Sequence, residues 1–310
     1  MGNKGVGYLE TIMTSEQAQK VSVGVAGWSY DDWNGYVYPR GTRDKLRFLA
    51  GYLDMIEINS SFYRPPQKKT VESWLRRTND LPRFFFSAKL GQEITHRGRI
   101  DSHTVAAFRN AFEPMSEAGK LKHILAQFRW DFADSGEKRN HLSAICDKFA
   151  DLANVTFELR HKSWQSSDAL AFLEELGATV ANLDYPVTGN SFNMRTCPVG
   201  EHAYLRLHGR NSKAWFSKDA GRDETYNYLY SANEMEDIVD RAVELAGMSK
   251  SLTLVANNHY QGKEVLNALE IKSKITGEKL DVPPDLARKY PRLKKIKRDH
   301  PQLPRQGILL

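Results

Sequence analysis

Eight short apolar segments of this chain each end in a burst of polar and aromatic residues. Apolar runs of this length, bounded by polar clusters, are typical of strands that are buried on both faces of a sheet. The segments that contain the predicted strands are Val21–Tyr30, Met55–Tyr63, Phe84–Leu90, Ile124–Trp130, Val155–Trp164, Thr179–Pro186, Ala203–Asn211 and Leu252–Tyr260.

Helical spacing of apolar residues follows most of these segments. Gly41–Leu53 has Leu46, Leu49 and Leu53 at that spacing, and Thr42 is the predicted N-cap. The segment Pro186–Glu201 has little helical character, so we expect a loop there. The other predicted helices are Thr70–Arg77, Thr104–Ala118, Lys138–Leu152, Asp168–Leu176, Asn233–Ala246 and Lys263–Lys274.

Regular alternation of buried strands and amphipathic helices predicts a parallel sheet covered by helices. Eight such units predict a single (β/α)8 TIM barrel, and 310 residues suffice for one barrel of roughly 250 residues with terminal extensions. We expect an N-terminal extension over residues 1–20, the barrel over 21–278, and a basic, Pro-containing tail over 279–310. In such barrels the active site lies at the carboxyl ends of the strands, where the polar bursts of this chain fall.

Charge and composition narrow the class of protein further. The formal net charge is +6 at pH 7, and a basic run, ARKYPRLKKIKRDHPQLPR, occupies residues 287–305. Such a run is typical of a solvated tail, with nucleic acid as the alternative partner. Cys146 and Cys197 lie far apart, which fits a reducing compartment. Since no apolar stretch reaches the roughly 20 residues that span a bilayer and no secretory signal is present, we expect a cytoplasmic protein without membrane contacts. The sequence leaves the oligomeric state open.

Nine strings occur in register along the chain: GVAGWSYDDW, EINSSFY, SAKL with a following ITH, LAQFRW, FELRHKSW, NLDYP, YLRLHGRN, YNYLY and NNHYQGKEVLNAL. Together they resemble the YecE-like family, a domain of unknown function of the DUF72 type, from about Val21 to Leu269. The resemblance implies a TIM-type barrel, in agreement with the pattern above, and it implies no established reaction.

Paired polar residues near the strand ends are the first candidates for chemistry, because side chains two positions apart on a strand share a face. A carboxylate inside a barrel must be paired, hydrogen-bonded or protonated, and we expect Arg160 to pair with Glu158 and Lys89 with Glu57. Such pairs are either internal salt bridges or parts of a site, and their position at the rim favours a site. The pairs are Glu57 with Asn59, Glu158 with Arg160, Asn182 with Asp184, and Arg206 with His208.

Cations and aromatic residues on the same rim predict the type of ligand. Lys89, Arg160 and Arg206 favour an anionic substrate. The segment His208–Ser231 is the longest insertion on this rim and is rich in aromatic residues, so we expect it to cover the site. The other predicted substrate-binding residues are Trp28, Asn59, Tyr63, Gln127, Trp164, Asn182, Asn211, Trp215, Tyr228, Asn257, Asn258 and His259.

These residues lead to one principal hypothesis and two alternatives. The principal hypothesis is an enzyme that acts on a small phosphate- or carboxylate-bearing substrate, with Glu158 or Glu57 as general acid/base, His208 assisting and Asp184 as a further catalytic candidate. The class of reaction, whether hydrolase, lyase or isomerase, stays open. We also expect Glu158→Gln and Arg206→Ala to preserve the fold while abolishing binding or turnover of the ligand.

The first alternative is a metal-dependent hydrolase or nuclease-like enzyme, in which Glu57, Glu158, Asp184 and His208 hold a divalent ion and the substrate is a phosphoester. The second is a ligand- or RNA-binding protein without catalysis. We predict no organic cofactor, since the sequence contains no Walker loop, GxGxxG or GxSxG motif.

Overall fold

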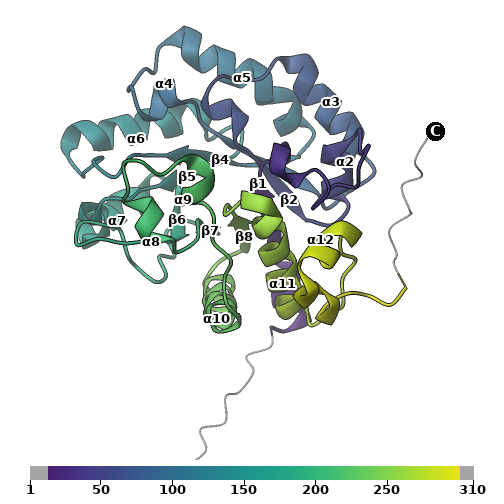
Figure 1. Ribbon diagram of the computed structural model, residues 1–310. Helices are drawn as coiled ribbons and strands as arrows, with labels where there is room; N and C mark the ends of the chain where they lie inside the picture. Colours follow the sequence, from purple (N-terminus) through teal and green to yellow (C-terminus); the bar gives the residue numbers. More distant parts are fainter. Residues whose placement is uncertain (1–12, 301–310) are drawn as a thin grey trace, which may run out of the picture.

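The fold is a closed parallel β-barrel in a computed structural model that describes residues 13–300 (Figure 1). Its eight described strands follow one another around the barrel in chain order, and β1 pairs with both β2 and β8. This confirms the predicted TIM barrel and all eight strand segments. The strands are β1 (Val21–Ala26), β2 (Met55–Ile58), β3 (Phe85–Lys89), β4 (Leu121–Gln127), β5 (Asn154–Glu158), β6 (Thr179–Asp184), β7 (His202–Leu207) and β8 (Ser251–Ala256).

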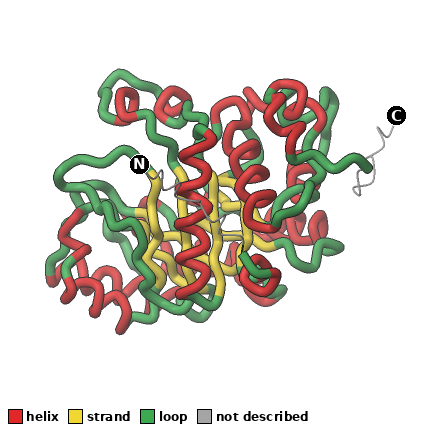
Figure 2. Tube along the Cα trace, turned by 90° about the horizontal axis from the view of Figure 1, so that it is seen from below, coloured by secondary structure: helices red, strands yellow, loops and turns green. Residues whose placement is uncertain are grey.

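Helices surround the sheet on its outer side, as seen along the barrel in Figure 1 and from below in Figure 2. The longer helices coincide with the predicted ones: α2 (Lys45–Ala50), α3 (Lys68–Thr78), α5 (Ser102–Glu117), α6 (Gly136–Phe149), α7 (Ser167–Glu175), α10 (Ala232–Met248) and α11 (Lys263–Thr276). Shorter helices lie at the ends of the chain and on the rim: α1 (Ser15–Gln19), α4 (Gln92–Thr95), α8 (Ser212–Trp215), α9 (Arg222–Thr225) and α12 (Pro284–Lys289). Single 3-10 turns are η1 (Asp31–Trp33), η2 (Ser60–Phe62), η3 (Lys162–Gln165), η4 (Tyr260–Gly262) and η5 (Pro291–Lys295).

One helix boundary differs from the prediction. Thr42 is not an N-cap, because its hydroxyl donates to the carbonyl of Pro39 within a turn. The cap of α2 is Asp44, whose side chain accepts a hydrogen bond from the amide of Arg47. The connection from β6 to β7 contains no helix among the described residues, so the loop predicted for Pro186–Glu201 is confirmed.

The interior of the barrel is arranged in layers. A small apolar cluster fills its middle, formed by Ala26, Met55, Phe85, Leu125, Ala181, Leu183, Tyr204 and Val255. Towards the amino ends of the strands, His123 lies between the hydroxyls of Thr156 and Thr253, each 3.0 Å from a ring nitrogen. Burial lowers the pKa of His123 to about 3, so this imidazole is neutral and structural. The charged residues lie at the opposite, carboxyl end.

The basic segment after α11 packs on the barrel up to the limit of the described residues. Leu286 of α12 and Leu293 of η5 are buried, and the guanidinium of Arg292 pairs with Glu270 of α11 at 2.6 Å. Part of the predicted tail is therefore an ordered layer beside α11 (Figure 1). Residues 1–12 of the predicted N-terminal extension and 301–310 of the tail lie outside the described residues.

No helix within residues 13–300 is long and apolar enough to cross a membrane.

Candidate functional site

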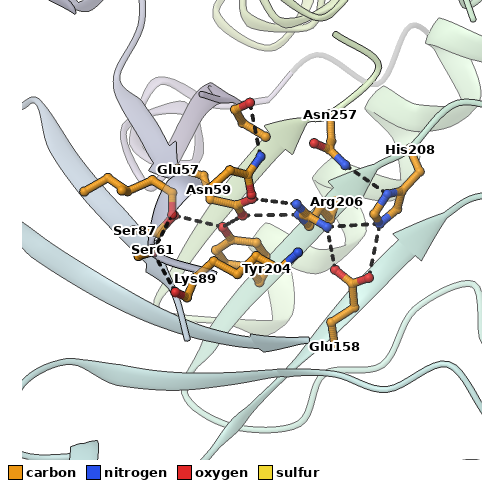
Figure 3. A network of polar contacts seen from close by, with 12 residues as sticks. Glu57, Asn59, Ser61, Ser87, Lys89, Glu158, Tyr204, Arg206, His208 and Asn257 are labelled. Carbon is orange, nitrogen blue, oxygen red and sulfur yellow. Dashed lines mark hydrogen bonds and ion pairs between the residues drawn. The ribbon is translucent and has the colours of Figure 1, made fainter. Parts of the chain in front are cut away.

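Arg206 is the centre of a buried ion-pair network at the carboxyl end of the barrel (Figure 3). Its Nη2 donates to Glu57 Oε1 at 2.6 Å, and its Nη1 donates to Glu158 Oε2 at 2.8 Å. All three side chains have at most 1% of their surface exposed. Burial would lower the pKa of Arg206, but the two carboxylates outweigh it and raise that pKa further. Arg206 therefore carries a permanent positive charge that neutralises carboxylates of β2 and β5.

Each carboxylate has a second partner. The hydroxyl of Tyr204 donates to Glu57 Oε2 at 2.8 Å, and Arg160 donates to Glu158 Oε1 from Nη2 at 2.6 Å. Burial acts to raise the pKa of Glu158, but the charges of Arg206 and Arg160 hold it well below its usual value. Glu158 is therefore ionised at neutral pH. The predicted pair of Glu158 with Arg160 is confirmed, whereas Glu57 pairs with Arg206 and Tyr204 rather than with Lys89 because β7 faces β2 across the barrel.

His208 is enclosed beside Glu158 and is fully buried. Its Nε2 lies 3.3 Å from Glu158 Oε1, and its Nδ1 lies 3.1 Å from the amide nitrogen of Asn257. Burial lowers the pKa of His208 to about 4, so the ring is neutral. Nδ1 therefore accepts from the Asn257 amide, and Nε2 lies between Glu158 Oε1 and Nη1 of Arg206, which is 3.4 Å away. His208 thus holds Glu158 in place and has no direct opening to solvent.

Lys89 differs from the other charged residues of this end of the barrel. It closes β3, and its Nζ lies over the ring of Phe62 at 4.2 Å from the centroid. Unlike Arg206, Lys89 has no ion pair with any described carboxylate. Burial and the charge of Arg206 lower the pKa of Lys89 to about 7. The uncharged amine of Lys89 is therefore accessible near neutral pH.

A cavity of about 360 Å³ lies above this network, and Lys89 and Arg206 form part of its wall. Aromatic rings of Trp28, Tyr30, Phe62 and Tyr226 line its sides, and Tyr63 stands at its edge with 69% of its surface exposed. The volume suits a small molecule, and the flat apolar walls suit a planar or ring-shaped one. The other lining residues are Gly27, Ser29, Asn59, Ser60, Gln127, Arg222, Asn257 and His259.

Two amide oxygens of the lining residues are buried without a hydrogen-bond donor among residues 13–300. They are Oδ1 of Asn59 and Oε1 of Gln127. The Asn59 amide nitrogen donates to the carbonyl of Ala26 at 3.3 Å, which fixes the orientation of that side chain. A buried acceptor without a donor costs free energy, so these two oxygens indicate positions for hydroxyl or amine groups of a ligand.

The insertion between β7 and α10 lies over the cavity, as predicted. Arg222 of α9 and the adjacent Tyr226 contribute directly to its lining. Trp215 of α8 packs edge-on against His208, with ring centroids 5.6 Å apart, and also lies against the guanidinium of Arg160. This segment therefore shields the buried network as well as forming one wall of the cavity.

The structure brings eight of the predicted residues to the cavity and places four more directly beside it. Those lining it are Trp28, Asn59, Tyr63, Lys89, Gln127, Arg206, Asn257 and His259. Those behind the lining are Glu57, Glu158, Arg160 and His208, in the ion-pair network.

Asp184 and Asn182 are not at the cavity. They lie on the outer side of β6, since Ala181 and Leu183 occupy its inner face. The carboxylate of Asp184 pairs with Arg210 at 2.6 Å and accepts from Tyr230 at 2.8 Å, and Asn182 Oδ1 accepts from the amide of Cys197 at 2.6 Å. Both side chains therefore anchor loops to the barrel, and the expectation that they point into it is wrong.

The remaining predicted residues have structural contacts around the rim. Trp164 is buried and donates to the carbonyl of Phe132, Asn211 caps α8, and Tyr228 donates to Glu234. Trp215 covers His208, and Asn258 donates to the carbonyl of Tyr228 and to Asn267. These contacts explain their positions at strand ends without a ligand.

The predicted metal-ligand set is not assembled. Asp184 lies outside the barrel, and Arg206 donates to both Glu57 and Glu158. Within residues 13–300, no group of three or more His, Cys, Asp or Glu side chains is placed to hold a metal ion.

Several residues of the site have no counterpart in the sequence prediction, among them Tyr204 and Arg222. Tyr204 lies two positions before Arg206 on β7, so strand alternation alone would have placed both on the inner face. Arg222 lies in the insertion, where no periodicity links sequence to direction, and only the fold brings it over the cavity.

Comparison with known proteins gives a family but no reaction. Residues 22–291 match the family model described as "Protein of unknown function DUF72". The UPF0759 protein YunF of Bacillus subtilis (strain 168) is 26% identical over 273 residues, which cover 81% of this chain and 95% of that protein. A DUF72 family protein of Thermotoga maritima MSB8 has a similar structure, with a TM-score of 0.73 at 29% identity over 82% of this chain and 98% of that one. Another, from Enterococcus faecalis V583, has a TM-score of 0.72 at 24% identity over 85% and 98% of the two chains.

Proposed function

The chain belongs to the DUF72 family, and from the geometry of its cavity we propose that it is an enzyme in which Lys89 acts as the general acid/base on a small anionic substrate. The main support is the Lys89 amine, which lines the cavity, has no ion pair among the described residues, and has its pKa lowered to about 7. A group whose pKa is near the working pH takes up and gives back a proton most effectively.

The position of Lys89 supports the same role. It is the last residue of β3, at the end of the barrel where catalytic groups of such folds are found. The hydroxyl of Ser61 donates to the carbonyl of Lys89 at 2.7 Å, which fixes the backbone from which the side chain extends. Figure 3 shows that side chain pointing towards the network around Arg206. A pKa shifted by burial and by specific neighbouring charges, in a cavity, is the usual mark of a functional group.

The balance of charges supports an anionic substrate. The carboxylates of Glu57 and Glu158 are offset by Arg206 and Arg160, which together form the buried network. Lys89 then contributes positive charge to the cavity wall beyond this balance, and Arg222 lines the same cavity while its guanidinium also pairs with Asp223 at 3.2 Å. A carboxylate or phosphate of the substrate would lie between these two cations, and its hydroxyl groups would reach the free amide oxygens of Asn59 and Gln127.

In this proposal the residues beneath the cavity position the catalytic group. Glu158 is ionised and held by two arginines, so it is a poor proton donor. His208 is neutral and enclosed, and it orients Glu158. Their function is to fix Arg206 and to set the electrostatic environment of Lys89. The acid/base role assigned to the glutamates from sequence thus passes to the lysine.

One variant of Lys89 and one control variant test this proposal. The purified protein is first screened by thermal shift against small carboxylates, sugar phosphates and hydroxy acids, and the compounds that stabilise it are then tested for turnover. Lys89→Arg keeps a positive charge at this position, but arginine does not release its proton near neutral pH and so cannot act as a base. We therefore expect this variant to bind the same compounds and to have a kcat at least about a hundredfold lower than wild type. Lys122→Met alters an exposed lysine at the opposite end of the barrel and should change neither.

The pH dependence separates a base from a simple binding cation. Turnover by the wild-type protein should rise to half of its maximum at the pH at which Lys89 loses its proton, close to 7. Turnover by Lys89→Arg at the wild-type rate, with the same pH profile, would refute the assignment.

A further inference from the structure

We propose that Lys89 forms an imine with an aldehyde or ketone group of the substrate, so that the substrate is a small carbonyl compound that also bears a carboxylate or phosphate. This inference rests on the role proposed above for Lys89 and extends it from proton transfer to covalent catalysis.

Access and an available electron pair are the first requirements for such a nucleophile. The Lys89 side chain lines the cavity, and the exposed edge formed by Tyr63 connects the cavity with solvent. Its Nζ rests on the face of Phe62 and has no hydrogen bond or ion pair with another described residue. The lone pair of the uncharged amine is therefore free to attack a carbonyl carbon in the cavity.

Other lysines with lowered pKa values lack this combination. Nζ of Lys120 donates to the carbonyls of Leu81 and Phe84, each at 2.7 Å, and Lys263 donates to Asn227. Their amines are held by acceptors outside the barrel, where they serve the structure. Lys89 is thus distinguished by geometry as well as by charge.

The buried network suits both states of the nitrogen. Arg206 and Arg160 disfavour a positive charge on Lys89, whereas Glu158 and Glu57 favour one. A protonated imine carries the same single charge as the ammonium group that it replaces. The network can therefore accommodate the imine without a change in its own ion pairs, and its carboxylates would stabilise the cation.

The reaction is a condensation that needs no oxidant or metal. The amine lone pair forms a C–N bond as the C=O π bond breaks, and a proton passes from the nitrogen to the oxygen to give a neutral carbinolamine. The C–O bond then breaks as the hydroxyl takes up a proton from solvent and leaves as water, while the nitrogen lone pair forms C=N, which gives the protonated imine. Water leaves through the open edge of the cavity, and Arg222, which also lines the cavity, can hold the anionic group of the substrate.

Reductive trapping with glyoxylate tests the inference, because glyoxylate is a very small compound with both an aldehyde and a carboxylate. The full-length protein is incubated at pH 7 with glyoxylate and cyanoborohydride, and modified lysines are identified and timed by peptide mass spectrometry. At this pH an ordinary lysine is uncharged in only about 0.04% of molecules. We therefore expect carboxymethylation of Lys89 at least about tenfold faster than that of Lys122.

Four outcomes are distinguishable. Preferential labelling of Lys89, lost in Lys89→Arg and retained in Lys122→Arg, supports the imine. Labelling of Lys89 no faster than that of exposed lysines overturns it. If Lys89 is not labelled but turnover still depends on it, imine formation is refuted and the general acid/base role of Lys89 stands. If Lys89→Arg keeps full turnover, the general acid/base role is refuted, whatever the labelling shows.

Discussion

Replacement of Arg206 by Met should destabilise the protein strongly, because it leaves two fully buried carboxylates without their shared partner. Glu57 and Glu158 have no exposed surface, and Arg206 donates to both at 2.6 and 2.8 Å. Removing one partner of a buried ion pair costs about 3–5 kcal/mol. Glu158 keeps its ion pair with Arg160, whereas Glu57 keeps the hydrogen bond from Tyr204, so we expect a loss within that range. From the sequence alone we expected the Arg206→Ala variant to keep its fold, whereas the structure predicts a large loss of stability when Arg206 is removed.

Urea unfolding followed by circular dichroism measures the loss, and two further variants control it. Arg288→Met removes a cation that is 78% exposed and paired with Asp285, so it should cost no more than about 1 kcal/mol. The double variant Glu57→Gln/Arg206→Met removes the stranded charge and should recover at least about 1 kcal/mol relative to Arg206→Met. A free energy of unfolding for Arg206→Met within about 1 kcal/mol of wild type would show that the network is hydrated rather than buried.

Three other predictions concern residues outside the ion-pair network. Burial and the charge of Glu57 raise the pKa of Glu264 well above 4.5, so the free energy of unfolding of the wild-type protein should fall as the pH rises above that value. Glu264→Gln cannot ionise, so its free energy of unfolding should increase relative to wild type by about 1.4 kcal/mol per pH unit in that range. Urea titrations in which the two proteins show parallel pH dependence would contradict this. Gly24→Ala should lower the free energy of unfolding by more than about 2 kcal/mol or prevent folding, because the new Cβ would lie 2.0 Å from the backbone oxygen of Met55. A thermal unfolding midpoint equal to that of the wild type would contradict this prediction. Asn182→Ala should lower the free energy of unfolding by about 1–3 kcal/mol, because it leaves the buried amide of Cys197 without its acceptor. It should leave the labelling of Lys89 by glyoxylate unchanged. Altered labelling would show that Asn182 acts at the cavity.

Much of the fold and part of the site could be predicted from sequence, because both follow from local periodicity. The strand segments, the longer helices and the helix-free connection after β6 each have a distinct pattern over several residues. Arg206 and His208 were placed on one inner face because strand alternation is a short-range rule, and the structure bears out that placement. The same rule would have added Tyr204.

The failures have a common physical cause, which is that side-chain partners come from distant segments. Polar residues at the end of β6 were expected to face the cavity, but Arg210 and Tyr230 of the insertion supply partners for Asp184 on the outer side. Glu57 was expected to pair with Lys89, whereas its partner, Arg206, lies on β7, on the other side of the barrel. No spacing in the sequence distinguishes these cases.

Closure of the barrel has a consequence for the order of events in folding. Strand β1 pairs with β8 in register from Val21 with Leu252 to Val25 with Ala256, so its second neighbour is synthesised roughly 230 residues later. Until then the amino-terminal strand has one unpaired edge, which is a template for association with other chains. Because synthesis proceeds at about 5–20 residues per second, this edge is exposed for ten seconds or more on the ribosome. Over that interval only the side of β1 that faces β2 has a partner strand, and truncation before β8 would leave the other edge permanently open.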